Sequence, residues 1–152
     1  MRKVCRMVLL FVSICAVLFV AASATDESKS YSVRIDLPNG DYVIETITED
    51  ADTTVTRATS TKSGHKTSVY YNSDDEAIFG VRVDGTFSYT GSTAWATSST
   101  ATVYIYDDSA SYVSKSTDYS SNFATATGKV KYNYVTISRT ATLYCDKNGN
   151  LS

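Results

Sequence analysis

The chain has 152 residues, a formal net charge of −2, one histidine and three cysteines. Its first 24 residues hold three basic residues and no acidic ones, so the remainder carries 11 basic and 16 acidic residues and a net charge of −5. Nucleic acid and anionic membranes both demand a positive protein surface, so this acidic composition argues against both as partners.

The N-terminal segment has the pattern of an export signal. Arg2 and Lys3 precede an apolar run over residues 7–20, and the small residues Ala22 and Ala24 follow it. This pattern predicts a signal peptide cleaved after Ala24, so that the protein is secreted and extracellular without a stable membrane anchor. A retained anchor is the less favoured alternative, because the run of 14 residues is shorter than the roughly 20 needed to span a bilayer.

Residues 25–64 are interpreted as a leader that holds one hairpin and a connection. Apolar and polar side chains alternate over residues 31–37, and a second such run covers residues 42–48. The turn signal Pro38-Asn39-Gly40-Asp41 lies between them, so the pattern predicts a β-hairpin over 31–48. Residues 49–64 are acidic and then rich in Ser and Thr, which indicates a connection or a weak edge strand.

Residues 65–152 are predicted to form the core of the fold. The strongest pattern covers residues 77–89, where apolar residues such as Phe79 and Val81 occupy odd positions, as on a strand with one buried face. Asp84-Gly85 predicts a β-bulge near its middle, because the inward phase is the same on both sides. A tight turn between two short strands is the alternative.

The remaining apolar alternations predict further strands around this one. Residues 92–99, which contain Trp95, give no clear pattern. Short alternating strands with turns between them predict an all-β fold, a single antiparallel β-sandwich of immunoglobulin-like or related type with about 7–9 short strands. A small closed barrel is the alternative. The other strands are expected at residues 67–72, 101–106, 112–117 with Val113 inward, 123–134 and 135–145.

Several short motifs in residues 65–152 resemble those of a known group of proteins. They read YYNS at 70–73, GTFSYTGS at 85–92 and LYCDKNGNLS at 143–152. In this order they are similar to a group of small exported all-β proteins of Gram-positive bacteria that has no assigned activity. The resemblance implies export and an all-β fold, and it implies no reaction. The second cysteine common in that group after the GTFxYxGS motif is missing from residues 93–97, so the disulfide it would form to Cys145 is not expected.

The residues suited to nucleophilic catalysis are few. His65 is the only histidine, so any Ser-His-Asp or Cys-His arrangement must use it, and its polar surroundings in sequence favour an exposed side chain. Cys145 is the only cysteine outside the predicted signal peptide, so an internal disulfide and a thiolate metal cluster are excluded. Its position in phase with Leu143 predicts a buried and inert thiol; an exposed thiol able to form an intermolecular disulfide is the alternative. No catalytic residue is assigned, and the protein is not expected to be an enzyme.

Acidic residues cluster in several predicted turns. Asp146, Asn148 and Asn150 have the spacing of the first half of a calcium-binding loop, but the later glycine and the distal glutamate are missing. Calcium is therefore a weak prediction, and solvated turn residues are the favoured interpretation. No other cofactor is expected. The further acidic clusters lie at residues 49–52, 74–76 and 107–108.

The tyrosines suggest a binding surface. Tyr104 and Tyr106 fall on the face opposite Val103 in the predicted strand, and with Trp95 they are candidate binding residues for sugar rings or a protein partner. The alternative is that these tyrosines pack across strands with their hydroxyls in water. The predicted function is that of an exported, non-catalytic protein acting by surface contact, through an envelope polysaccharide or a protein partner. One alternative is a hydrolase that acts on cell-wall material through two carboxylates. A more remote one is a membrane-inserting β-hairpin protein.

Overall fold

The computed structural model describes residues 28–50, 54–55 and 59–152, with backbone alone for 54–55. The predicted signal peptide and its cleavage site lie outside these residues, as does Asp52. The described part contains nine strands and no helix, and therefore no helix that could cross a bilayer. The strands are β1 (Ser30–Asp36), β2 (Tyr42–Glu49), β3 (Thr54–Val55), β4 (Ser60–Tyr71), β5 (Ala77–Tyr89), β6 (Ala94–Ile105), β7 (Ser111–Ser120), β8 (Phe123–Tyr132) and β9 (Val135–Tyr144).

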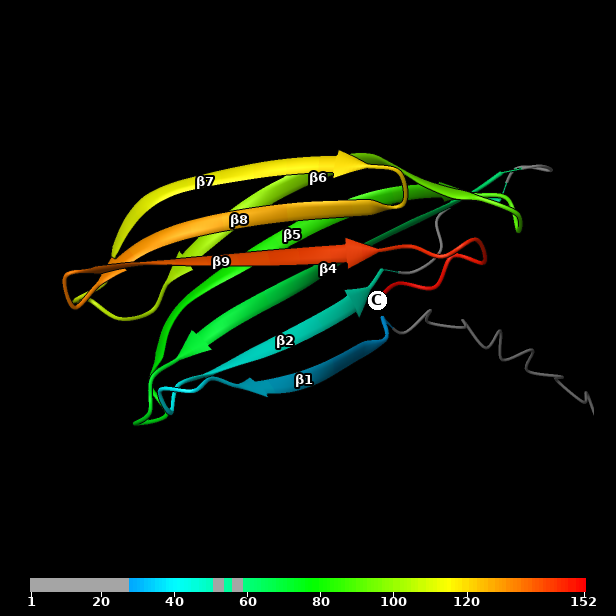
Figure 1. The fold of residues 1–152 in the computed structure, drawn as a ribbon. Coiled ribbons are helices and arrows are strands. Elements are labelled where there is room, and N and C mark those ends of the chain that lie inside the picture. The colour runs from blue at the N-terminus through cyan, green and yellow to red at the C-terminus, as the bar shows by residue number, and fades with distance from the viewer. Residues whose placement is uncertain (1–27, 51–53, 56–58) are drawn as a thin grey trace, which may run out of the picture.

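The strands form two antiparallel sheets that lie face to face (Figure 1). The large sheet has the order β1-β2-β4-β5-β6, with the short β3 paired to the start of β4, and the small sheet has the order β7-β8-β9. The small sheet packs on β4, β5 and β6, whereas β1 and β2 extend beyond it. This arrangement confirms the predicted antiparallel β-sandwich.

The core lies between the small sheet and β5. The side chains of Phe79, Val81, Val83 and Phe87 are fully buried, as their odd positions predicted. Opposite them the small sheet contributes alanines and other compact side chains, which let the two sheets approach closely. The fully buried members from this sheet are Ala124, Ala126, Val130, Ala141 and Leu143.

β5 is one continuous strand, but its bulge is not at Asp84-Gly85. Gly85 pairs in regular register with Gly64 of β4. The extra residue of β5 is Ile78, because Ala77 and Phe79 pair with the consecutive residues Tyr71 and Tyr70 of β4. A second shift, opposite Thr86 and Phe87, leaves Thr97 of β6 as the extra residue. Gly85 serves a different purpose, because a Cβ there would lie 2.9 Å from Cε2 of Phe87. The missing side chain makes room for the Phe87 ring in the core.

Two further expectations are corrected by the register of the small sheet. Val113 was expected inward, but a bulge between Tyr112 and Ser114 displaces it and leaves it 48% exposed. Tyr134 was expected within a strand, but it lies in the two-residue turn between β8 and β9. One inserted residue reverses which positions face inward beyond it, so a face assigned by alternation is correct only up to the bulge.

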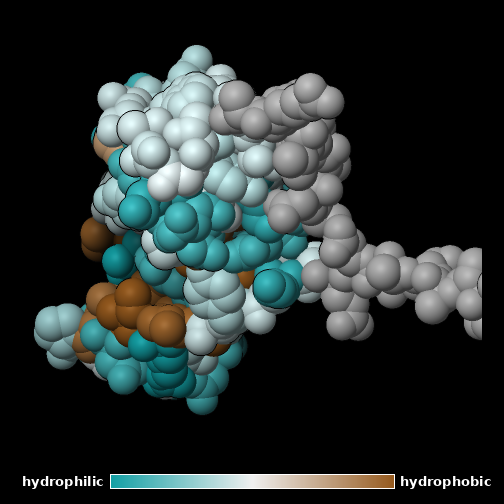
Figure 2. Space-filling model, turned by 90° about the vertical axis from the view of Figure 1, so that its right-hand side faces the viewer, coloured by the Kyte–Doolittle hydropathy of each residue, from teal (hydrophilic) through white to brown (hydrophobic). Residues whose placement is uncertain are grey.

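The part of the large sheet that the small sheet leaves uncovered carries charge on its inner face. Lys66 on β4 pairs with Glu45 on β2, their side-chain atoms 2.9 Å apart. The C-terminal tail covers part of this face, since Leu151 is buried there and its carbonyl accepts a hydrogen bond from the Tyr31 hydroxyl. Seen from the right-hand side of Figure 1, an apolar patch borders a hollow in the surface (Figure 2).

Candidate functional site

The twelve tyrosines of the chain are unevenly distributed over the sandwich. β1, β4, β6 and β8 end, and β2, β5, β7 and β9 begin, at the same end of the molecule (Figure 1). Most tyrosines lie at or just beyond these strand ends, and we call this region the tyrosine-rich end. Its tyrosines are Tyr42, Tyr70, Tyr71, Tyr104, Tyr106, Tyr112, Tyr132 and Tyr134.

Four of these tyrosines lie on the outer face of the large sheet, and two of them form a closed stack. Tyr42 and Tyr71 are directly paired across β2 and β4, with ring centroids 4.8 Å apart and an interplanar angle of 3°. The guanidinium carbon of Arg34 lies 3.5 Å from the centroid of the Tyr42 ring. Both faces of Tyr42 are thus covered, and it is only 6% exposed. This stack stiffens the sheet beside the more exposed rings.

The other two, Tyr104 and Tyr106, form the exposed part of the surface. Their ring centroids are 6.3 Å apart at an interplanar angle of 12°, and the side chains are 36% and 50% exposed. Burial, followed by the neighbouring hydroxyls of Tyr104 and Tyr71, raises the pKa of Tyr106. The Tyr106 hydroxyl therefore stays protonated at neutral pH and can donate a hydrogen bond. We call Tyr104 and Tyr106 the outer-face tyrosine pair.

Trp95 does not join this pair. It lies on the same face of the large sheet and is 40% exposed, but it pairs with Ser88, whereas Tyr104 pairs with Gly80. Eight residue steps along β5 separate these two positions, which amounts to roughly 26 Å. The three residues predicted as one binding group therefore lie in two places, at opposite ends of the sheet.

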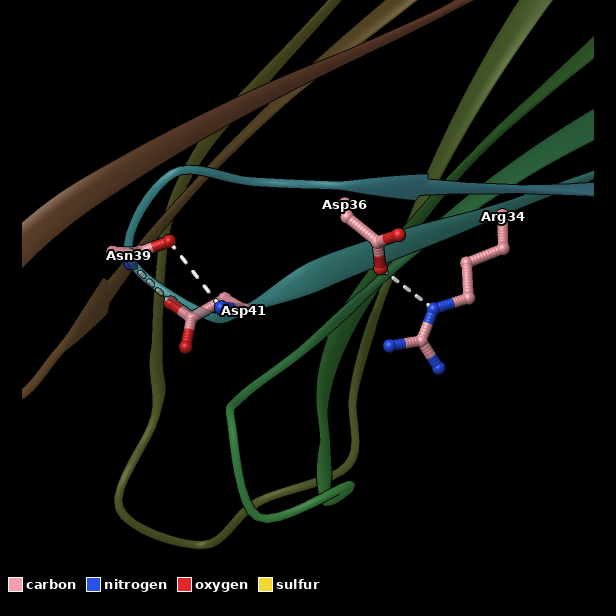
Figure 3. Close-up of polar contacts among 4 residues, drawn as sticks. All are labelled: Arg34, Asp36, Asn39 and Asp41. Atoms are coloured by element: carbon pink, nitrogen blue, oxygen red, sulfur yellow. Dashed lines mark hydrogen bonds and ion pairs between the residues drawn. The ribbon is translucent and has the colours of Figure 1, made fainter.

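The turn between β1 and β2 fixes another part of the tyrosine-rich end (Figure 3). The Asn39 side-chain amide donates to the Asp41 carboxylate at 2.5 Å, and the Asp41 backbone N–H donates to the Asn39 side-chain oxygen at 3.4 Å. The same carboxylate accepts a hydrogen bond from the Tyr70 hydroxyl. Burial and this carboxylate raise the pKa of Tyr70. Arg34, which covers Tyr42, also donates a hydrogen bond from Nε to the Asp36 carboxylate at 2.8 Å (Figure 3).

The other candidate residues are placed elsewhere. His65 lies partly buried on the outer face of β4, directly opposite Asp84, and burial followed by the charge of Arg82 lowers its pKa. Cys145 is fully buried, as its phase predicted, and burial raises the pKa of its thiol to about 11. The two residues belong to different parts of the fold, His65 to the outer face and Cys145 to the core.

The predicted calcium residues form a closed turn. One carboxylate oxygen of Asp146 accepts the backbone N–H groups of Asn148 and Asn150 at 2.8 and 2.9 Å, and the other accepts the Asn150 side-chain amide at 2.8 Å. These hydrogen bonds, first those from Asn150, lower the pKa of Asp146. Among the residues that the structure describes, no group of three His, Cys, Asp or Glu side chains is arranged to hold a metal ion.

Comparisons of the chain with protein families, with curated proteins and with solved structures give no match. The fold and the residues therefore define the class of protein by themselves, which is an all-β sandwich with a tyrosine-rich end. Sequence reasoning found the outer-face tyrosine pair but missed Tyr42 and Tyr71. In the sequence, Tyr42 lies at the start of one predicted strand and Tyr71 near the end of another. Only the pairing of β2 with β4 shows that these two positions are adjacent.

Proposed function

We propose that this is an exported, non-catalytic protein that binds an envelope polysaccharide through the outer-face tyrosine pair. The observation that carries the proposal is the parallel arrangement of Tyr104 and Tyr106 on an exposed sheet face. Tyrosine offers a rigid apolar surface together with a polar hydroxyl, at a small cost in side-chain entropy. The C–H groups and hydroxyls of a sugar chain are complementary to both.

The surroundings of the pair support a neutral ligand. Thr100 and Thr102 continue the same face of β6, and Thr67 lies in the same row of the sheet as Thr102. Arg82, the nearby cation, is already paired with Asp84. Hydroxyl groups without unpaired charge suit a polar, uncharged chain better than an acidic one. The basic and apolar pattern at residues 2–20 supports export.

The test is co-sedimentation of the protein, purified after expression of the full chain, with cell-wall fractions and insoluble neutral polysaccharides. We expect retention that EDTA does not change and that releases no sugar. Tyr104→Ala and Tyr106→Ala should each weaken retention, roughly three- to tenfold if each ring contributes as an aromatic contact does. Tyr119→Ala is the matched control, because Tyr119 is 48% exposed at the opposite end of the sandwich.

The other functions give different results in this assay. Release of soluble sugar that a single carboxylate substitution abolishes would replace the proposal with a wall hydrolase. Retention lost in EDTA would move the site to the acidic turns. A protein that stays in the supernatant with every polysaccharide would overturn the proposal and direct the search to a protein partner.

A further inference from the structure

A cavity of about 440 Å³ opens at the tyrosine-rich end, between the ends of the two sheets. Its size falls within the roughly 300–1,000 Å³ typical of small-molecule sites. Tyr70 and the turns of the large sheet form one wall, and Tyr132 with the start of β9 forms the other. This cavity lies between the sheets, whereas the outer-face tyrosine pair lies on the opposite side of the large sheet.

The lining of the cavity suits a neutral ring that carries several hydroxyls. Tyr70, Tyr132 and Ile137 supply aromatic and apolar surface, and Asp41, Asp74 and Asn133 supply oxygen acceptors and an amide. Carboxylate and amide groups accept and donate hydrogen bonds to neighbouring hydroxyls, while a ring face packs on the apolar wall. No basic side chain is among the described residues that line it, although the guanidinium carbon of Arg139 lies 5.1 Å from the centroid of the Tyr70 ring. The two carboxylates in the lining, Asp41 and Asp74, favour a neutral ligand over an anionic one.

Part of this lining is held in place before any ligand binds. The Asp41 carboxylate is fixed by Asn39 and by the Tyr70 hydroxyl. The Asn72 amide donates to Glu76 at 2.9 Å and reaches the Tyr132 hydroxyl at 3.5 Å, which links the two sheets across the cavity. Walls fixed in this way lower the entropic cost of ordering a site on binding.

Other groups in the lining remain available for a ligand. The side chains of Asp74 and Asn133 line the cavity, and the hydrogen bonds of the described residues leave their carboxylate and amide without a partner. The site thus combines fixed aromatic walls with free hydrogen-bonding groups. That combination is what recognition of a hydroxyl-rich ring requires.

The turn beside the cavity has an unusual residue in a strained conformation. Asn133 and Tyr134 have φ values of 48° and 65°, as in the type I′ turn of a two-residue hairpin. Asparagine tolerates this region, but for tyrosine it is unfavourable, and glycine is the residue favoured there. Tyr134 is 96% exposed, so its ring gains nothing from packing in the fold. Tyr134 thus has a strained backbone conformation that no packing of its side chain offsets, and such strain is typical of residues that contact a ligand.

The turn also separates two cavities. Asn133 lines the first cavity and a second one of about 340 Å³, whose lining includes Tyr134 and Lys131. A chain bound in the first cavity would continue past Asn133, which lines both cavities, into the second cavity, which Tyr134 lines. We propose that this end of the sandwich binds the end of a neutral oligosaccharide chain, with Tyr134 stacking on a sugar ring. This site is independent of the outer-face tyrosine pair.

The test is calorimetric titration of the purified protein with soluble neutral oligosaccharides, namely cello-, xylo- and chito-oligosaccharides, with acidic oligogalacturonides as the charged comparison. We expect at least one neutral series to bind, and more tightly than the acidic one. Tyr134→Gly and Asp74→Ala should each weaken that binding roughly three- to tenfold. Neither substitution removes a buried group or an internal side-chain contact, so both variants should fold, which circular dichroism verifies.

The control separates this site from the proposed function. Tyr104→Ala should leave the titration unchanged while it weakens retention on insoluble polysaccharide. Absence of binding by every neutral series overturns the second site, as does binding in Tyr134→Gly and Asp74→Ala at wild-type affinity. A titration weakened by Tyr104→Ala alone would place the soluble ligand on the outer face and likewise overturn it.

Discussion

The ring of Tyr106 lies over the backbone of Gly80, so that a Cβ at residue 80 would be 3.2 Å from the Tyr106 hydroxyl oxygen and 3.3 Å from Cε2. Because Gly80 has no side chain, the Tyr106 ring, just beyond the end of β6, can lie directly on the backbone of β5. The backbone N–H of Tyr106 donates to the carbonyl of Ile78 at 3.0 Å, which fixes the chain at this point. The position of the Tyr106 ring in the outer-face tyrosine pair therefore depends on Gly80, which lies beneath the ring and has no side chain to contact a ligand.

Gly80→Val should displace the Tyr106 ring and weaken retention on insoluble polysaccharide about as much as Tyr106→Ala does. Valine suits an internal strand position, so the free energy of unfolding should change by less than about 1 kcal/mol. Co-sedimentation and urea unfolding measure the two effects separately. Ser88→Val, on the same face of β5 but paired with Trp95 at the far end of the sheet, should leave retention unaltered. Wild-type retention by Gly80→Val would mean that binding does not need Tyr106 in this position.

Tyr134→Gly should stabilise the protein even though it is expected to weaken oligosaccharide binding. Glycine adopts positive φ without the clash that a side chain meets, and the gain is about 1 kcal/mol after allowance for the greater freedom of glycine in the unfolded chain. The urea midpoint should rise with an unchanged slope. Asn133→Gly should give a smaller rise, since asparagine already tolerates this conformation. A lower midpoint for Tyr134→Gly would show that the tyrosine ring supports the fold.

The alternation of side chains predicted which face of β5 is buried because a strand repeats every two residues. Phe79, Val81 and Val83 could therefore be assigned to the core from their positions in the sequence alone. The same reasoning failed at Val113 and at the bulge of β5, which lies at Ile78 and not at Asp84-Gly85. An inserted residue shifts the alternation by one position, and the pairing with the partner strand shows where that shift occurs.

Alternation also explains why the sequence predicts only part of the candidate site. Tyr104 and Tyr106 are neighbours in sequence, and their common face follows from alternation alone. Tyr42 and Tyr71 join that face because β2 pairs with β4 in a register that places them directly opposite each other. Trp95 shares the face but lies at the far end, a separation that only the register of β5 and β6 reveals. Two residues on the same face of a sheet can therefore be far apart, and only the strand register gives their separation.

Glu45→Gln should destabilise the protein more than Asp36→Asn does. Glu45 and its partner Lys66 have side chains that are 25% and 16% exposed, whereas Asp36 and its partner Arg34 are 75% and 54% exposed. Loss of one charge from the shielded pair leaves the other poorly solvated, at about 1–2 kcal/mol, whereas water screens the exposed pair and makes its loss less costly. Urea unfolding of both variants measures the difference. Equal losses would mean that water reaches both pairs alike.

Cys145 should make stability fall in alkaline solution. Burial raises the pKa of its thiol from 9.0 to about 11, so the folded protein keeps a proton that the unfolded chain loses. Between these two values each step upward in pH therefore favours the unfolded state. The loss is about 1.4 kcal/mol at pH 10 and approaches about 2.7 kcal/mol well above pH 11. Urea unfolding from pH 8 to pH 10 should show this decline. The tyrosines with raised pKa values, Tyr31, Tyr42, Tyr70 and Tyr106, add to it near pH 10, because the unfolded chain loses those protons first as well.

Cys145→Ala isolates the contribution of the thiol, because the variant should lose stability less steeply than the wild type over the same pH range. Its stability near neutral pH is expected to be lower by about 1 kcal/mol, since a small cavity replaces the sulfur in the core. The same burial predicts that a thiol reagent modifies the wild-type protein only after denaturant is added. Rapid modification of the folded protein, or an equal pH decline in Cys145→Ala, would place the thiol within reach of solvent and contradict its assignment to the core.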